Sequence, residues 1–584
     1  MFRSSELPDC TYVNQPTLIS PKTSTPNHTL YLSNLDDQKF LRFSIKYLYL
    51  FRRSIGAEAL KDSLSRVLVE YYPLAGRLRK TEENDDHKLE VDCNGEGAVF
   101  AEAVMDLSAD EFLEMAGKPN KSFRKLLYKV EASGFLDVPP LVVQVTHLRS
   151  EGMILCTAIN HCLCDGIGSS QFLHAWAHFT AKSNPSNLQI SPYHFRHVLK
   201  PGNTKAADPL HPVFTRRITH DSHDALNINE YLQSLPLVAA SVTFSSSQIL
   251  HLKKQCVPSV KCTAFDVLAS HTWRCWVTAL ELPCVSSVKL LFSVNVRKKL
   301  MNDIPEGYYG NGFVLACAEA KAKDLTSPNL HDCVKLVQHA KSVINDEYVK
   351  SVVDMLEDKS TMTDLSTSFV ISQWSKLGLE DVDFGQGKPI HMGPVVSDIY
   401  CLFLPVIRDP EAVTVLVSMP ESTIDKFEYY MTKAFEMEEN GDAKSTRGAE
   451  NLQMDALGTG ETNVFDDTEF FLVEELSLGR EVGGLSSSTE LLSYKSGNIV
   501  IDHTKNNKQR GMSRDLSSGD GQDVPESSAT SSILLPRTHD VRLSVFGARD
   551  VYRGCRILGS RAAYGYISID KNGYIVGNKA KAND

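Results

Sequence analysis

The sequence lacks the features that would tie it to a membrane or to nucleic acid. No stretch of its 584 residues approaches the roughly 20 consecutive apolar residues that a spanning helix needs. The N-terminus carries a charge pair and Pro8 where a signal peptide has an apolar run. A net charge of −11, with no block of Lys and Arg, is opposite to the basic face that nucleic acid requires. We therefore expect a soluble, cytoplasmic protein with no membrane span and no nucleic-acid partner.

Cysteine is present in number but without a pattern. The chain has 13 cysteines, mostly scattered singly, and no Cys-x-x-Cys pair. Cys162 and Cys164 are too close for an easy disulfide and lack partners at zinc spacing. We expect reduced thiols and no metal site.

Most of the chain has an ordinary globular composition, with 42% hydrophobic and 23% charged residues. Its length exceeds what one hydrophobic core usually supports. Apolar strand-like runs such as 153–159 alternate with amphipathic helical runs such as 57–72, a pattern typical of an α/β fold.

The pattern changes at two places along the chain. Residues 183–234 have little apolar periodicity, which predicts a crossover linker between one domain at 1–182 and another at 235–436. From 437 to 584, Asp, Glu, Ser, Gly, Asn and Thr dominate, which predicts a low-complexity and largely disordered tail. Short apolar islands such as 564–569 could form local strands within that tail.

His161 lies where active-site groups of α/β proteins tend to be found. It follows the apolar run 153–159, and Asp165 and a glycine turn lead from it into a helical run. The His-x-x-x-Asp spacing alone is weak, because His220 and Asp224 repeat it inside a polar segment. From the residues alone, His161 is either a general base or a core histidine bonded to a backbone carbonyl.

Further segments accompany this motif in a fixed order along residues 10–435. With His161–Gly166 and the run Asp383–Phe384–Gly385–Gln386–Gly387, they are Tyr71–Leu78, Asp92–Gly97, Pro139–Leu141, Gly307–Asn311, Ile371–Trp374 and Gly393–Pro394. In this order they resemble the plant BAHD acyltransferases, which carry His-x-x-x-Asp-Gly mid-chain and Asp-Phe-Gly-Trp-Gly near the end. The tail lies outside the resemblance.

The resemblance implies two similar-sized domains like that of chloramphenicol acetyltransferase, each a mixed sheet flanked by helices, with a channel between them. It implies a monomer with acyl-CoA as co-substrate, no further cofactor, and an alcohol or amine acceptor. The acyl group would be hydroxycinnamoyl or fatty acyl. The stretch Leu30–Asp36 is most similar to members that use long-chain alcohols or ω-hydroxy acids, such as ω-hydroxypalmitate feruloyltransferases and alcohol acyltransferases.

The chemistry of acyl transfer needs a base for the acceptor hydroxyl, and an imidazole suits this at neutral pH. The resemblance gives this role to His161, acting directly on a ternary complex. A rival is an acyl-enzyme formed on the thiol of Cys162 or Cys164. Asp165 invites a triad interpretation, but the resemblance implies that it pairs with Arg297 and, with Gly166, fixes the turn.

Other positions take roles from the resemblance. Ser372 is a candidate donor to the oxyanion, or a strand hydroxyl, and Trp374 lines a substrate pocket or belongs to the core. Asp383, Phe384, Gly385 and Gly387 would hold a loop in shape. Gln386 replaces the family's tryptophan, which leaves open a non-catalytic partner protein that modulates another acyl-lipid enzyme.

Overall fold

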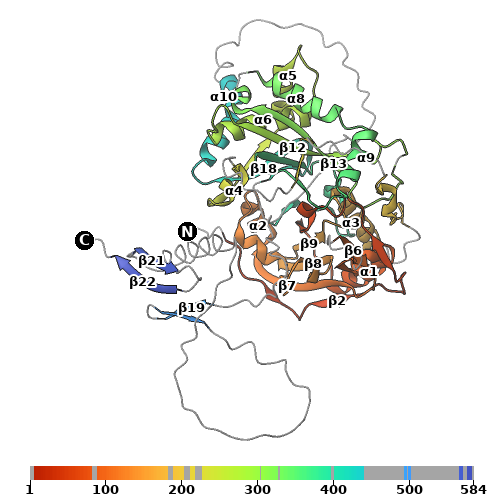
Figure 1. The fold of residues 1–584 in the computed structure, drawn as a ribbon. Helices are drawn as coiled ribbons and strands as arrows, with labels where there is room; N and C mark the ends of the chain where they lie inside the picture. The colour runs from red at the N-terminus through yellow and green to blue at the C-terminus, as the bar shows by residue number, and fades with distance from the viewer. Residues whose placement is uncertain are drawn as a thin grey trace. The chain divides into compact units, whose positions relative to one another are not determined.

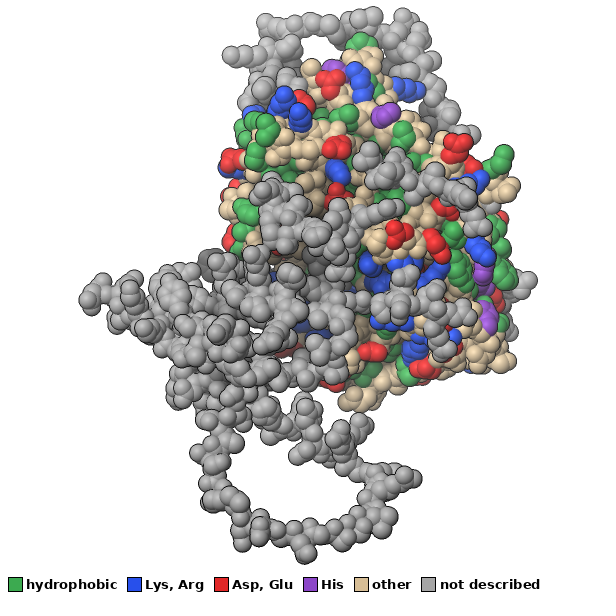
Figure 2. All heavy atoms as spheres, viewed as in Figure 1, with side chains coloured by type: hydrophobic (Ala, Val, Ile, Leu, Met, Phe, Trp, Pro, Cys, Tyr) green, Lys and Arg blue, Asp and Glu red, His purple; other side chains and the backbone are tan. Residues whose placement is uncertain are grey.

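The computed structural model describes residues 6–81, 88–181, 188–202, 211–216, 227–302, 304–326, 329–395 and 400–439, and four strands beyond residue 491. By compactness the chain divides into a unit at Met1–Glu481 and a unit at Val482–Asp584. Among the described residues, no helix is both long and apolar enough to cross a membrane. Acidic and basic side chains are interspersed over the described part of the face drawn in Figure 2.

The first large sheet is mixed and is built almost entirely from the N-terminal half. Its strands are β1 (Thr11–Tyr12), β2 (Thr17–Ile19), β4 (Ser44–Phe51), β7 (Ala98–Ser108), β8 (Leu141–Arg149), β9 (Met153–Asn160) and β16 (His391–Pro394). Their order is β1-β7-β8-β9-β4-β16, with β2 also paired to β7. β7 and β8 are parallel, and β9 lies antiparallel between β8 and β4.

Side chains on β4 alternate between two cores, as the period of a strand requires. Tyr47 and Tyr49 face the larger core together with helices α1 (Ala57–Glu70) and α3 (Gly166–Ala181). Leu48 and Leu50 face a second core that includes helix α2 (Ala109–Ala116). The sheet is therefore buried on both faces, which agrees with the near-continuous apolar character of β9.

The second large sheet comes from the C-terminal half. Its strands are β11 (Leu237–Phe244), β12 (Ser287–Asn295), β13 (Phe313–Lys321), β15 (Ser368–Gln373), β17 (Cys401–Val406) and β18 (Asp409–Pro420). Their order is β11-β18-β17-β15-β12-β13. Helices α5 (Ser246–Cys256), α6 (Ala264–Ala279), α8 (Leu330–Ser342) and α10 (Ile424–Glu439) gather on one side of this sheet (Figure 1).

Shorter elements complete the described chain. The remaining helices are α4 (Ile228–Gln233), α7 (Ala322–Leu325) and α9 (Asp346–Met355), and the 3-10 turns are η1 (Lys39–Leu41), η2 (Tyr72–Ala75), η3 (Lys121–Leu126), η4 (Phe135–Asp137), η5 (Arg196–Leu199) and η6 (Leu379–Asp381). A three-stranded sheet joins β3 (Thr29–Tyr31), β6 (Leu89–Asp92) and β5 (Arg77–Lys80), and β10 (Phe214–Arg216) pairs with β14 (Thr361–Thr363). The second unit contains two hairpins, β19 (Leu492–Lys495) with β20 (Asn498–Ile501) and β21 (Tyr564–Ile569) with β22 (Ile575–Lys581).

The α/β prediction with two sheet-containing bodies is confirmed, and so is the local strand at Tyr564–Ile569. The domain boundaries at 182, 234 and 436 stay a prediction. One strand crosses them, because β16 comes from the second predicted range but pairs with β4 in the first sheet. Apart from the end of α10 and the strands β19 to β22, the predicted tail lies outside the described residues, as does the pair His220 and Asp224.

Candidate active site

His161 is buried at the end of β9, in the turn that leads to α3. Its backbone N–H donates to the carbonyl oxygen of Phe43 at 2.9 Å, which ties the turn to the residue just before β4. Its ring is fully buried and lies 5.1 Å from the ring of Phe43 and 6.4 Å from the ring of Phe313. The strand, the turn and these two rings therefore hold the imidazole in an apolar setting.

This setting controls the charge of the imidazole. Burial lowers the pKa of His161 to about 4, because the charged form loses its hydration. Hydrogen bonding with its own backbone and with the Asn311 side chain, and the Asp36 carboxylate, act in the opposite direction. His161 is therefore neutral at pH 7, the form that can accept a proton.

Asp165 has its acceptor positions filled by groups other than His161. Both carboxylate oxygens accept from Arg297 Nη2, at 3.0 and 2.8 Å. Oδ1 also accepts from the N–H of Gly168 at 2.8 Å, and Oδ2 from the N–H of Gly312 at 2.9 Å. An ionised carboxylate offers about four acceptor sites, so these four bonds use the capacity of Asp165. Because they come from Gly168 on one side and from Arg297 and Gly312 on the other, Asp165 ties the start of α3 to the second half of the chain.

Two glycines let the start of α3 approach the second half closely. Gly166 is buried and is the first residue of α3. A Cβ added at Gly168 would lie 1.9 Å from the carbonyl oxygen of Tyr309, so only glycine fits there. The Tyr308–Gly312 segment therefore packs directly on the turn that carries His161.

Arg297 follows β12 and reaches back across this segment. Besides Asp165, it donates to the carbonyl oxygens of Tyr308 at 3.3 Å and Gly310 at 2.9 Å. Asn295 accepts from the backbone N–H of Arg297 at 2.9 Å through Oδ1. A neutral amide thus supplies a local bond, and the ion pair to Asp165 forms without a charge at position 295.

Ser372 and Trp374 lie at the end of β15, in the second sheet. Ser372 is fully buried, and within the described chain no hydrogen-bond partner lies within reach of its hydroxyl. The Trp374 ring stacks on Tyr47 of β4, with centroids 4.7 Å apart and planes 12° apart. His161 packs on Phe43 and Trp374 packs on Tyr47. Phe43 and Tyr47 are four residues apart on an extended backbone, so these two contacts are about 13 Å apart along it.

The Asp383–Gly387 loop lies far from His161. Asp383 Oδ1 accepts from the N–H of Gly385 at 2.7 Å and of Gly387 at 2.9 Å, and both glycines have positive φ, at 99° and 102°. Phe384 packs edge-on against Phe51 and Trp176. Gly385 lies beside Ala181, the last residue of α3. Because α3 has 16 residues, this loop lies about 22 Å from the His161 end of the helix.

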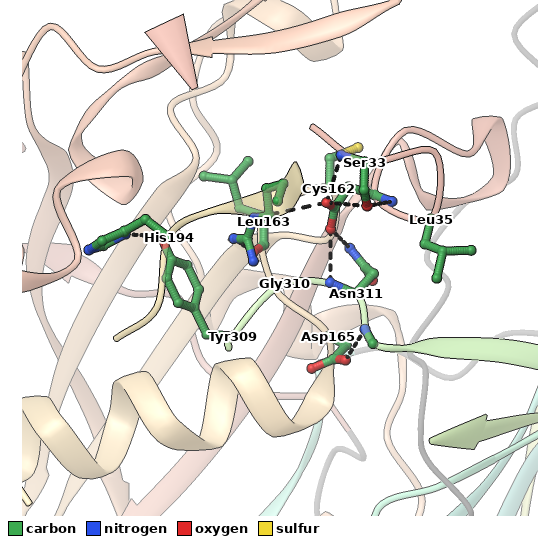
Figure 3. Close-up of polar contacts among 12 residues, drawn as sticks. Ser33, Leu35, Cys162, Leu163, Asp165, His194, Tyr309, Gly310 and Asn311 are labelled. Atoms are coloured by element: carbon green, nitrogen blue, oxygen red, sulfur yellow. Dashed lines mark hydrogen bonds and ion pairs between the residues drawn. The ribbon is translucent and has the colours of Figure 1, made fainter. Parts of the chain in front are cut away.

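Three further residues surround His161 and were missed by reasoning from the sequence. Asp36, Arg196 and Asn311 form a buried polar network that reaches the His161 carbonyl oxygen, and Figure 3 shows its contacts around Ser33, Leu163 and Asn311. Asp36 and Asn311 lie at the ends of segments that matched the family, but nothing in their spacing assigns them a role. Arg196 falls in the predicted crossover, where periodicity gives no signal.

Comparison with known proteins shows the family of this chain. A family model described as Transferase family matches residues 12–434, which is most of the chain. This chain belongs to that family, the BAHD acyltransferases. The chain is 33% identical over 428 residues to an omega-hydroxypalmitate O-feruloyl transferase of Arabidopsis thaliana, covering 71% of this chain and 91% of the relative. It is also 33% identical over 427 residues to a fatty alcohol:caffeoyl-CoA acyltransferase of the same species, covering 71% and 97%.

Solved structures show the same fold at lower identity. A crystal structure of vinorine synthase aligns with a TM-score of 0.54 and 20% identity over 73% of this chain and 98% of the other. F. graminearum TRI101 complexed with coenzyme A and T-2 mycotoxin aligns with a TM-score of 0.57 and 16% identity, covering 68% and 96%. These similarities confirm the fold that the resemblance implied.

This BAHD acyltransferase also has a cavity of about 270 Å³ that His161 does not line. The cavity lies between α2 and η3 on one side and strands β11, β17 and β18 on the other, with β16 along it. Its lining mixes apolar side chains, including Leu113, Phe123 and Leu416, with polar groups that include Thr243 and His391. Among the described residues, no group of three His, Cys, Asp or Glu side chains could hold a metal ion.

Replacing Gln386 by tryptophan should change neither activity nor stability measurably. Gln386 is exposed, and the loop around it is held by Asp383 and the two glycines instead. Exposed substitutions of this kind usually stay within about 0.5 kcal/mol. Asp383→Ala is the matched variant, which removes both loop hydrogen bonds and should lower the unfolding midpoint. A rise in kcat of tenfold or more in Gln386→Trp would show that the missing indole matters.

Stability should fall between pH 6.5 and pH 4 because four histidines are held neutral. Burial lowers the pKa of His161, His194, His271 and His391 to about 4 each, from an unfolded value near 6.5. Between these values the unfolded chain binds more protons, so the free energy of unfolding decreases as the pH falls. Each histidine accounts for up to about 2 kcal/mol of loss at pH 5. Urea unfolding from pH 7.5 to pH 4.5 measures this, and a flat profile across that window would contradict it.

Proposed function

We propose that this chain transfers an acyl group from a CoA thioester to an alcohol, with His161 as the general base in a ternary complex. The observation that carries the proposal is a buried, neutral imidazole at a strand end, in a chain whose relatives are named as O-acyltransferases. Neither a nucleophilic side chain nor a cofactor beyond acyl-CoA is needed for this chemistry.

Each step moves one proton or one acyl group. The neutral imidazole takes the proton of the acceptor hydroxyl as its oxygen bonds to the thioester carbonyl carbon. The resulting oxyanion needs a donor, and the Ser372 hydroxyl, buried at the end of β15, is available for it. Collapse breaks the carbon–sulfur bond and the imidazolium returns its proton to the CoA thiolate. Because burial lowers the pKa of His161, its protonated form donates this proton readily.

Asp165 and Arg297 have a structural role in this proposal. Their ion pair ties the start of α3 to the loop after β12. The N–H groups of Gly168 and Gly312 also donate to Asp165, which strengthens this link. Gly166 begins the helix, and Asp383, Phe384, Gly385 and Gly387 shape a loop at its far end. Trp374 bridges the halves by stacking on Tyr47 and belongs to the core or to a pocket wall.

The substrates are proposed from the named relatives. Named relatives act on omega-hydroxypalmitate or fatty alcohol, with feruloyl or caffeoyl donors. We infer a hydroxycinnamoyl or fatty acyl donor and a long-chain alcohol or ω-hydroxy acid acceptor, with an amine as the less favoured acceptor.

A panel of acyl-CoAs against alcohols and amines, read by CoA release and product mass, tests this function. We expect at least one hydroxycinnamoyl-CoA or fatty acyl-CoA to give an ester whose formation requires His161. If no pair gives CoA release above that of a His161→Ala control, the enzyme proposal fails.

A covalent acyl-enzyme on cysteine is disfavoured by the state of the thiols beside His161. Burial raises the pKa of both Cys162 and Cys164, so neither forms a thiolate readily. We expect Cys162→Ala and Cys164→Ala to keep kcat within a few-fold, with no mass increase of the wild-type protein after incubation with acyl-CoA alone. An acyl adduct on the protein would restore the thiol mechanism.

We also infer a cytoplasmic location and a monomeric state. The twelve described cysteines are free thiols, which supports a reducing, cytoplasmic location. A monomer is proposed from the family resemblance alone. The alternative of a non-catalytic partner protein rested on Gln386. That residue is exposed, on a loop at the far end of α3, so it gives the alternative little support.

A further inference from the structure

Asp36 is a buried carboxylate whose hydrogen-bonding capacity is filled by two residues from opposite halves of the chain. Its side chain has 0% exposure. Oδ2 accepts from the N–H and the hydroxyl of Ser33, at 3.0 and 2.6 Å. Oδ1 accepts from the backbone N–H and from Nδ2 of Asn311, at 2.8 and 2.9 Å. A fully bonded buried carboxylate of this kind holds its partners in one geometry.

Arg196 balances the charge of Asp36 and fixes the neighbouring loop. Its side chain also has 0% exposure, and its Nε lies 3.9 Å from Asp36 Oδ2. The guanidinium lies over the rings of Tyr308 and Tyr309, at 4.9 and 4.4 Å, and donates to the carbonyl oxygen of Leu163 at 3.0 Å. A Cβ at Gly310 would lie 1.9 Å from Arg196 Nη1, so this packing requires glycine there. The Tyr308–Asn311 segment is therefore held by Arg196 as well as by Arg297.

Asn311 is the member of the network that reaches His161. While Asp36 holds its backbone and side chain, its Nδ2 also donates to the carbonyl oxygen of His161 at 2.8 Å. Figure 3 shows this chain of contacts from Ser33 through Asn311 to the turn after β9. The imidazole of the same residue is flanked by the rings of Phe43 and Phe313. One buried amide thus holds the backbone carbonyl of the residue that carries the imidazole.

We propose that Asn311, held by Asp36, is a positioning residue that fixes the His161 carbonyl and thereby the direction of the imidazole. This inference rests on the proposed function, since it concerns the same base. The bond from Asn311 spans the two halves of the chain, so the base is set correctly only when both are assembled. Misplacing a reacting group by about 1 Å can cost on the order of 10²-fold in rate.

The test is the kinetics of Asn311→Ala beside a matched control. We expect kcat to fall by about 10–100-fold with KM for both substrates nearly unchanged, because orientation and not binding is lost. Asn34→Ala is the control. Asn34 is also fully buried and donates from Nδ2 to the second half, to the Val353 carbonyl oxygen at 2.9 Å and Glu357 at 2.7 Å. It should lose comparable stability yet keep kcat. Equal kcat in the wild-type protein and in folded Asn311→Ala would overturn the proposal.

A second pair of variants separates positioning from a general structural role. In a His161→Ala background, Asn311→Ala should lower the residual rate by no more than about twofold, because the group that it positions is gone. A further tenfold loss there would show a structural role and overturn the proposal. Asn311→Ser, whose shorter hydroxyl cannot span from Asp36 to the His161 carbonyl, should behave as Asn311→Ala does and serves if the alanine variant does not fold.

Different results would contradict the proposed function and the positioning role of Asn311. If the wild-type protein shows no acyl transfer, the proposed function fails before Asn311 is examined. If the wild-type protein is active and His161→Ala is not, but Asn311→Ala matches the wild type, only the positioning role fails.

Discussion

His161→Ala should lower kcat by about 10²–10⁴-fold, the range typical of a lost general base. The imidazole is neutral at pH 7 because burial lowers its pKa to about 4, and the variant removes the group proposed to take the acceptor proton. Steady-state rates of CoA release, measured with a saturating alcohol, give the result.

The matched control is another buried histidine outside this turn. His271 on α6 is 7% exposed, has a pKa that burial also lowers to about 4, and contacts the Met431 carbonyl oxygen at 3.0 Å. His271→Ala should lose stability but keep kcat within a few-fold. Loss of rate in His271→Ala equal to that in His161→Ala would point to general destabilisation and not to a missing base.

Asp165→Ala and Arg297→Ala should each destabilise the fold by about 3–5 kcal/mol, the usual cost of leaving one partner of a buried ion pair alone. The two side chains meet at 2.8 Å with exposures of 1% for Asp165 and 13% for Arg297. The free energy of unfolding, from urea titration, should fall by similar amounts in both single variants. The double variant should lose less than their sum, because the second substitution removes an already unpaired charge.

The same variants decide between a scaffold and a triad. A scaffold predicts that both variants lose stability together and that any rate loss follows it. A triad predicts that Asp165→Ala has a lower rate at unchanged stability, and that Arg297→Ala keeps the rate of the wild-type protein. That second pattern would contradict the structural assignment, in which Asp165 bonds with Arg297, Gly168 and Gly312.

Local elements followed from the sequence because their burial patterns are regular. The helical period at residues 57–72 became α1, and the apolar run at 153–159 became β9, which is covered on both faces. The strand–turn–helix setting of His161 was predictable for the same reason. These features depend on neighbours in sequence, which a single chain displays directly.

Features that depend on distant segments did not follow. Asp36, Arg196 and Asn311 meet only after the two halves pack, and each alone resembles an ordinary polar residue. Strand β16 spans His391–Pro394, which is too short to show alternation, so its pairing with β4 had no signal. The stacking of Trp374 on Tyr47 likewise needs the positions of two sheets.

The central claim is that this chain moves an acyl group directly from CoA to an alcohol through His161. The most direct test follows free CoA and ester product together, in a single turnover of enzyme preloaded with acyl-CoA and mixed with alcohol. We expect both to appear at the same rate in the wild-type protein, and both to be slowed by about 10²-fold or more in His161→Ala. Release of CoA before the ester forms, or an unchanged rate in His161→Ala, would contradict it.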